Sequence, residues 1–240
     1  AETYGKTSIL QRINKNITDE DLLAGARTAW EDGWSSIKLY FLIGIPDETD
    51  ADILAILDLA DRVSHLRREV ARDSGQVNCS ISTFVPKPHT PYQWDPMNRP
   101  EEIERKKRLL LDHVRNRKVR LKFHTTLEST FEGVLSKGDR RVGEAIFEAY
   151  RLGCRLDAWS DHFQPDRWFE AFRRAGIDPE WYAYRTFGEH ERFSWEHLKP
   201  GISRKYLWIE REKARKLGFT SDCREDRCHG CGVDETHCFK

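Results

Sequence analysis

Residues 35–50, SSIKLYFLIGIPDETD, contain the pattern that indicates the fold class of this chain. The first half is a short apolar run that Gly44 and Pro46 end, and such a run predicts a β-strand followed by a tight turn. Asp50 then opens a predicted helix, in which apolar side chains recur at helical spacing. These are Ile53, Leu54, Ile56, Leu57, Leu59 and Val63. The stretch therefore predicts a strand, a turn and a helix in succession.

The same unit recurs along the first half of the chain. Residues 77–85 and the segment from Val119 have the composition of strands, and a helix is predicted between them from Pro100, with proline in its first turn. Before the first strand, Thr18 and Asp21 have the spacing of a capping box, which predicts the start of another helix. Strands about 40 residues apart that alternate with helices favour a parallel sheet, either open or closed as a barrel. Three such units are too few to close an eight-stranded barrel.

After about residue 126 the predicted structure is mostly helical. Two helices separated by Gly138 are expected there, and a third is expected to end at Gly176. We therefore divide the chain into three parts: residues 1–126 as the βα region, residues 127–218 as a helical extension, and residues 219–240 as a cysteine-rich tail.

Composition limits the compartment and the partners. The chain carries 40 Lys and Arg residues against 40 Asp and Glu residues, so that its formal net charge is zero and no global field attracts it to nucleic acid or to a membrane surface. No apolar run reaches the length of a membrane span, and the first residues lack the basic-then-apolar order of a secretory signal. We expect a cytoplasmic protein without a membrane partner, in which thiols stay reduced.

Four of the six cysteines gather in the tail: Cys223, Cys228, Cys231 and Cys238. In a reducing compartment, closely spaced cysteines are more often metal ligands than disulfides. The two-residue gap between Cys228 and Cys231 lets both sulfurs face one metal, and either zinc or an iron–sulfur cluster would accept four thiolates. His229 and His237 are further candidate ligands for zinc. The spacing does not choose between the two metals, and a tail of free thiols is the alternative.

Gly44, Ile45 and Glu48 directly follow the first predicted strand. In parallel βα folds, ligands bind at the carboxyl ends of strands, where glycine lets a backbone approach closely and a carboxylate can bind a hydroxyl or an amine. These three residues are therefore a candidate binding site. The alternative is that Gly44 only shapes the turn, while Glu48 and Asp50 favour the start of the next helix electrostatically.

A second candidate site is the segment LDAWSDHF, residues 156–163, which holds Asp157, Asp161 and His162. Carboxylate and imidazole groups that lie close together can move protons or bind a metal, and an adjacent tryptophan can stack on a planar substrate. The alternative is a histidine that is hydrogen-bonded for structural reasons alone.

Six separated motifs carry a family resemblance. They are INKNITDEDLL, WSSIKLYFLIGIPDET, VNCSISTFVPKPHTPYQW, FEGVLSKGDRRVGEAI, GCRLDAWSDHF and TSDCREDRCHGCGV. In this order they resemble the C-terminal half of radical S-adenosylmethionine (SAM) enzymes. The most similar members are bacterial radical SAM proteins of unassigned reaction, which often carry a cobalamin-binding-like N-terminal domain. The resemblance covers nearly the whole chain.

The resemblance implies a fold and a set of cofactors. The fold is α/β: the C-terminal part of a partial (β/α) barrel, with a mostly helical extension and a cysteine-rich metal-binding tail. The turn from Gly44 to Glu48 would lie against the adenosyl group of S-adenosylmethionine, with Ile45 in contact with the adenine, and Glu2 would correspond to a polar residue near the ribose or methionine end. A [4Fe-4S] cluster is the second implied cofactor, and cobalamin is a further one.

One departure from the family affects the expected function. Family members hold their [4Fe-4S] cluster with a CxxxCxxC loop, and that spacing does not occur in these 240 residues. The resemblance thus implies part of an enzyme that generates a 5′-deoxyadenosyl radical to act on an unknown substrate, with the cluster ligands in an N-terminal half that this chain lacks. Loss of the activity is the other explanation.

The alternative function is a non-catalytic, zinc-binding α/β module that binds RNA or a protein partner. Residues 203–218 predict a basic amphipathic helix whose Lys and Arg side chains would meet RNA phosphates. Glu210 and Glu212 interleave with those cations, which favours a solvated helix face instead.

Overall fold

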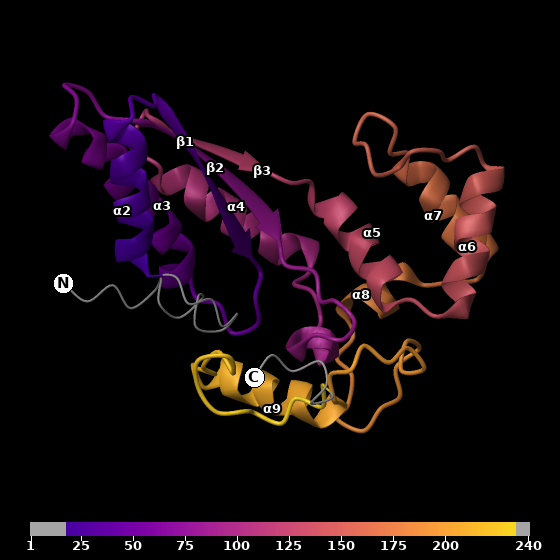
Figure 1. Ribbon diagram of the computed structural model, residues 1–240. Coiled ribbons are helices and arrows are strands. Elements are labelled where there is room, and N and C mark those ends of the chain that lie inside the picture. The colour runs from indigo at the N-terminus through magenta and orange to yellow at the C-terminus, as the bar shows by residue number, and fades with distance from the viewer. Residues whose placement is uncertain (1–17, 234–240) are drawn as a thin grey trace.

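The computed structural model describes residues 18–233 and contains one parallel sheet of three strands in the order β1-β2-β3 (Figure 1). The strands are β1 (Ser36–Ile43), β2 (Gln76–Thr83) and β3 (Val119–Phe123). The pairing aligns Ile37 with Val77, and Val77 in turn with Val119. The mixed α/β class and the parallel sheet that the sequence predicts are thus confirmed.

Three helices cover one face of this sheet: α2 (Asp19–Glu31), α3 (Asp50–Leu66) and α4 (Pro100–His113). Both α2 and α3 begin with a complete capping box, in which Thr18 pairs with Asp21 and Thr49 pairs with Asp52. The three helices and the inward side chains of all three strands form a single buried apolar cluster. Because one cluster joins them all, the three helices lie on the same side of the sheet.

The opposite face of the sheet carries mainly polar side chains. Alternate residues along the strands point away from the helices, and they include Lys38, Tyr40, Asn78, Arg120 and Lys122. Tyr40 is 73% exposed, and the three cations are exposed as well. A parallel sheet is ordinarily covered on both faces. Within residues 18–233, this face, which we call the bare face, is therefore largely open to solvent, although Ser80 on it is 6% exposed.

The regular secondary structure in the remainder of the described chain is helical, as the sequence predicts. It contains α5 (Thr126–Lys137), α6 (Arg140–Arg151), α7 (Pro165–Arg174), α8 (Pro179–Tyr184) and α9 (Arg204–Arg215), and two short 3-10 helices lie earlier, η1 (Arg67–Glu69) and η2 (Pro91–Trp94). Gly138 separates α5 from α6, as expected from the sequence. Helices α5 to α8 share a second buried cluster, which includes Phe131, Trp168 and Phe172. None of the described helices is both long enough and apolar enough to cross a membrane.

Helix α9 is fixed to the loop around η2 by a buried ion pair. Both Asp95 and Arg211 have side chains that are almost fully buried, and the guanidinium donates to both carboxylate oxygens at 2.7 Å. Trp94, beside this pair, lies edge-on to Phe193 and Trp208. The bidentate geometry orients α9 near the ends of the strands, as Figure 1 shows.

Candidate functional site

The carboxyl end of β1 is a tight turn that requires glycine. Gly44 has a φ of +91°, and a Cβ atom at this position would lie 2.9 Å from the Cδ1 atom of Ile103 on α4. The amide of Gly44 donates a hydrogen bond of 2.7 Å to the Oε2 atom of Glu48. The turn is thus closed by its own glutamate.

Glu48 and Lys106 form a buried ion pair beneath this turn. Their side chains are 0% and 4% exposed, and Lys106 Nζ lies 2.9 Å from Glu48 Oε2. Lys106 also donates to Asn98 Oδ1, whereas Glu48 Oε1 is buried and has no hydrogen-bond partner within residues 18–233. Burial raises the pKa of Glu48 even though the charge and hydrogen bond of Lys106 lower it. The pair fixes the turn to α4.

The sequence-predicted adenosyl contacts therefore lie together, but they point inward. Ile45 is 1% exposed and packs with Phe84, Tyr92 and Ala214 of α9. The Glu48 carboxylate is used by the turn itself, as described above. A ligand at this edge would therefore contact the backbone of the turn and neighbouring side chains, and not the side chains of Ile45 and Glu48. Glu2, the fourth expected contact, lies outside the described residues.

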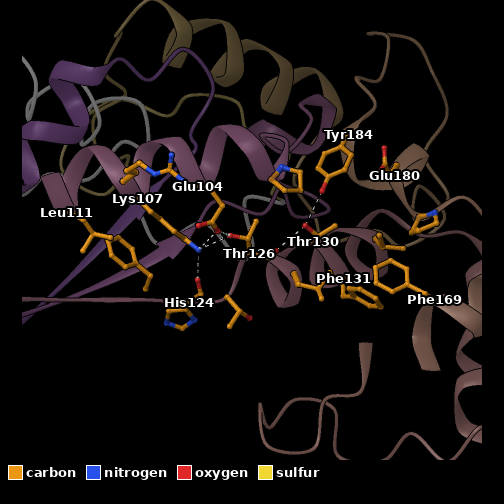
Figure 2. Close-up of a pocket in the computed structure, with 17 residues that line it drawn as sticks. Glu104, Lys107, Leu111, His124, Thr126, Thr130, Phe131, Phe169, Glu180 and Tyr184 are labelled. Atoms are coloured by element: carbon orange, nitrogen blue, oxygen red, sulfur yellow. Dashed lines mark hydrogen bonds and ion pairs between the residues drawn. The ribbon is translucent and has the colours of Figure 1, made fainter. Parts of the chain in front are cut away.

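Two cavities flank helix α5. We call the larger one the helical cavity; its volume is about 860 Å³ and it lies between α4, α5 and α8 (Figure 2). Lys107 at its edge donates to Glu104, Thr126 and the carbonyl oxygen of His124, so that its charge is neutralised within the protein. The rest of the lining is mostly apolar.

The second cavity, which we call the acidic cavity, has a volume of about 610 Å³. Its lining includes His124, Glu128, Glu132, Asp157, Phe163 and Trp168. Figure 2 shows the carbonyl of His124 turned toward Lys107 and the imidazole turned away from the helical cavity. His124 continues the alternation of Arg120 and Lys122 on the bare face of the sheet. The acidic cavity therefore adjoins the carboxyl end of β3 on the bare side.

Of the three candidate residues in the segment 156–163, only Asp157 lines this cavity. Asp161 and His162 are exposed, and the backbone amide of His162 closes a turn onto the carbonyl of Trp159. Asp161 and His162 are thus not part of the lining to which Asp157 belongs. Asp157 is half-buried, and its Oδ1 atom has no hydrogen-bond partner among the described residues.

The three described tail cysteines, Cys223, Cys228 and Cys231, are free thiols. The amide of Gly230 donates to Cys228 Sγ at 3.4 Å, and the backbone carbonyl oxygen of Cys231 accepts a hydrogen bond of 2.7 Å from the amide of Ser203 at the start of α9. Within residues 18–233, however, no group of three or more His, Cys, Asp or Glu side chains is gathered in a way that could hold a metal ion. Cys238 and His237 lie outside the described residues.

Several residues of the site were not identified from the sequence. Lys106, the partner of Glu48, is 58 residues away along the chain, and its neighbours on α4 are also charged. Glu128 and Glu132 lie four residues apart on α5, which places both on one helix face directly after a strand. That spacing after the carboxyl end of β3 is the signal that could have revealed them.

Comparisons with known proteins leave the family open. No family model matches the chain, and no solved structure matches it. A curated relative is an uncharacterized protein of Methanocaldococcus jannaschii, which is 24% identical over 179 residues. That alignment covers 74% of this chain and 38% of the relative. The chain therefore spans well under half the length of the curated relative that it matches.

Proposed function

We propose that this chain is the C-terminal part of a radical SAM-type (β/α) barrel enzyme, and that the bare face of its sheet forms part of the inner wall of the barrel. The six motifs described above support the family assignment. The single structural observation that carries the proposal is the one-sided sheet, in which α2, α3 and α4 cover one face and the other face is polar.

This arrangement is the one that a barrel requires. In a (β/α) barrel every helix packs outside and the opposite face of the sheet faces the interior, whereas a doubly wound open sheet has helices on both sides. Strand β1 lies at the edge of the described sheet, because it pairs with β2 on one side and with no described strand on the other. A preceding strand from additional chain would pair with this edge and continue the wall.

The residues present do not fit the iron–sulfur cluster of such an enzyme. Cys79 and Cys154 are buried and isolated, and the tail cysteines lack the CxxxCxxC spacing. Burial raises the pKa of Cys79 to about 12, which disfavours the thiolate that a metal needs. The proposal therefore assigns the cluster ligands to chain outside these 240 residues. The part assigned to this chain is to form the cavity, exclude water and orient the substrate.

The proposal is tested on the complete reading frame that contains this segment. We expect it to encode a CxxxCxxC loop upstream of Ala1, and we expect the anaerobically purified product to form 5′-deoxyadenosine from S-adenosylmethionine after reduction. A frame that lacks the loop, or a reconstituted protein that forms no 5′-deoxyadenosine, would contradict the proposal.

The second candidate function is the zinc-binding module, and the tail supplies the observation that favours it. Metal-binding Cys-x-x-Cys turns point backbone amides at their sulfurs, and Gly230 makes such a contact with Cys228. Gly232 has a φ of +95°, and a Cβ atom there would lie 2.9 Å from Ser203, so that the turn is seated against the start of α9.

Metal and sulfide analysis identifies what the tail cysteines bind. About one zinc per chain without sulfide, lost in the variant Cys228→Ala plus Cys231→Ala, would support a zinc site in the tail. Iron with acid-labile sulfide would instead identify an auxiliary cluster. Protein without either metal would refute the expected role of the tail cysteines.

A further inference from the structure

Three cations lie on the bare face of the sheet without a partner of opposite charge among the described residues. Lys38 of β1 and Arg120 of β3 align with Asn78 of β2 in one row across the sheet, and Lys122 lies two residues after Arg120 on the same face. All three cationic residues are exposed. Within residues 18–233 none of them forms an ion pair, and the Nζ atom of Lys38 lies 4.7 Å from the ring centroid of Tyr40. The bare face is thus a positively charged surface.

The sheet itself supplies no negative charge to balance these cations. None of the residues of β1, β2 and β3 is Asp or Glu. Directly before β3, by contrast, Lys118 forms an ion pair of 2.7 Å with Asp73. The acidic cavity adjoins the same face at the carboxyl end of β3, but among the residues described none of its carboxylates forms an ion pair with any of the three cations. The positive charge of the face is therefore left for a partner outside the sheet.

The three cations are close enough to contact one small ligand. Neighbouring strands are about 4.8 Å apart, so the Cα atoms of Lys38 and Arg120, on either side of β2, are roughly 10 Å apart. A step of two residues along a strand separates Arg120 from Lys122 by about 6.6 Å. Like charges within a Debye length of about 8–10 Å repel one another. An anion among the three side chains relieves this repulsion, whereas a cation would add to it.

The barrel proposed above would enclose this face, and enclosed charges have to be neutralised. A charge that leaves water needs a partner of opposite sign. A phosphate monoester carries about 1.5 to 2 negative charges at neutral pH and offers three acceptor oxygens. A carboxylate carries a single charge on two oxygens. Two phosphate groups therefore match the charge of three cations in a smaller volume than carboxylates do.

From these observations we propose that the bare face binds the phosphate groups of a small phosphorylated substrate. Lys38 and Arg120 contact phosphate oxygens from the two sides of Asn78, whose side-chain amide adds a neutral donor, and Lys122 contacts a second phosphate group. The inference rests on the proposed function, because the bare face is the substrate side of the barrel. It names the class of substrate that such an enzyme would take.

The test compares anions that differ in charge and in geometry. The probes are pyrophosphate, orthophosphate and citrate, at pH 8 without divalent cations; citrate matches pyrophosphate in charge but carries it on carboxylates. Binding to the 240-residue protein is measured by isothermal titration calorimetry. We expect pyrophosphate to bind at least about tenfold more tightly than orthophosphate and at least about threefold more tightly than citrate.

Substitutions assign the binding to the bare face. Arg120→Gln plus Lys122→Gln should weaken pyrophosphate binding at least about tenfold, and Lys38→Gln alone at least about threefold. The matched control is Arg140→Gln plus Lys205→Gln, which removes the same two charges from exposed positions on α6 and α9 and should weaken binding less than about twofold. All the changed residues are exposed, so the urea midpoints of the variants should equal that of the wild type.

Three results with the 240-residue protein would overturn the inference. Equal binding of pyrophosphate and citrate would refute the phosphate class, and equal effects of the two double variants would refute the site. The third concerns a ten-residue oligouridylate. If it binds more tightly than pyrophosphate and loses this binding in Arg120→Gln plus Lys122→Gln, the phosphates belong to single-stranded RNA and not to a small molecule.

The same titration of the product of the complete reading frame tests the enclosed face. Pyrophosphate should bind there as well and should still depend on Arg120 and Lys122. If it does not bind, the preceding strands neutralise the cations, and the inference is overturned. These titrations need no S-adenosylmethionine, so they can fail while the complete protein still forms 5′-deoxyadenosine. Such a result would refute the ligand class and leave the barrel proposal standing.

Discussion

Replacing Lys106 by methionine should strongly destabilise the protein, because it leaves the carboxylate of Glu48 alone in the interior. Both side chains are at most 4% exposed, and the Oε2 atom of Glu48 would keep only its hydrogen bond from the amide of Gly44. The Oε1 atom has no partner in the described part of the wild-type chain. Removing one member of a buried ion pair typically costs about 3–5 kcal/mol. In a urea titration this corresponds to a midpoint lower by about 2 M.

The loss of stability in Lys106→Met should also depend on pH, and its sign follows from the pKa of Glu48. Lys106 now lowers the pKa of Glu48, which burial raises, so the pKa of Glu48 rises further in Lys106→Met. A carboxyl group whose pKa is higher in the folded state than in the unfolded state binds more protons when folded, and stability then falls as pH rises from the unfolded pKa through the folded one. The loss caused by Lys106→Met should therefore be larger at pH 8 than at pH 5.

Two further variants test the same reasoning about the buried pair of Glu48 and Lys106. Adding Glu48→Gln to Lys106→Met removes the stranded charge and should recover at least about half of the lost stability. Arg108→Met, on the exposed surface of the same helix, should cost less than about 0.5 kcal/mol. If Lys106→Met costs no more than Arg108→Met and shows no dependence on pH, the reasoning about the buried pair is wrong.

Three other predictions follow from single contacts. Gly44→Ala should destabilise the protein by more than about 1 kcal/mol because of its positive φ and the 2.9 Å contact with α4, whereas Gly25→Ala, with open space in α2, should stabilise it by about 0.5–1 kcal/mol in the same urea titration. Arg211→Met should cost about 3 kcal/mol, because Asp95 then keeps only its longer ion pair with Arg215 at 3.6 Å, and an unchanged thermal midpoint would contradict this. Burial raises the pKa of the Cys79 thiol to about 12, so iodoacetamide at pH 8 should modify Cys79 only after unfolding, as peptide mapping by mass spectrometry can check.

The secondary structure was predictable because its signals are local. The capping pair Thr18 and Asp21 and the helix break at Gly138 each act over a few residues, and the structure has each of them where it was expected. The 3-10 helix η2 was not predicted, because the prolines of the segment 86–94 disfavour helical backbone in the residues before them. There the chain turns so that Trp94 can enter the cluster beneath α9.

The candidate site was predictable only in part, because its contacts join distant segments. Glu48 was expected to face a ligand, yet it pairs with Lys106 on α4, and no local pattern distinguishes an inward from an outward side chain in a turn. Asp157 was identified as a polar residue beside a tryptophan, but the cavity that it lines depends on how α5 and α7 pack. Trp168 carried no signal other than hydrophobicity, since its missing hydrogen-bond partner is a property of the fold.

Chemical labelling of the bare face tests the barrel proposal most directly. In the 240-residue protein, Tyr40→Cys should react rapidly with a maleimide, because Tyr40 is 73% exposed in this structure. In the product of the complete reading frame, strands from the preceding chain should enclose that face, and the same cysteine should react at least about tenfold more slowly. Ile146→Cys on the exposed side of α6 is the control and should react equally in both proteins. Equal reactivity of Tyr40→Cys in the two proteins would show that the bare face stays open to solvent, and would contradict the account.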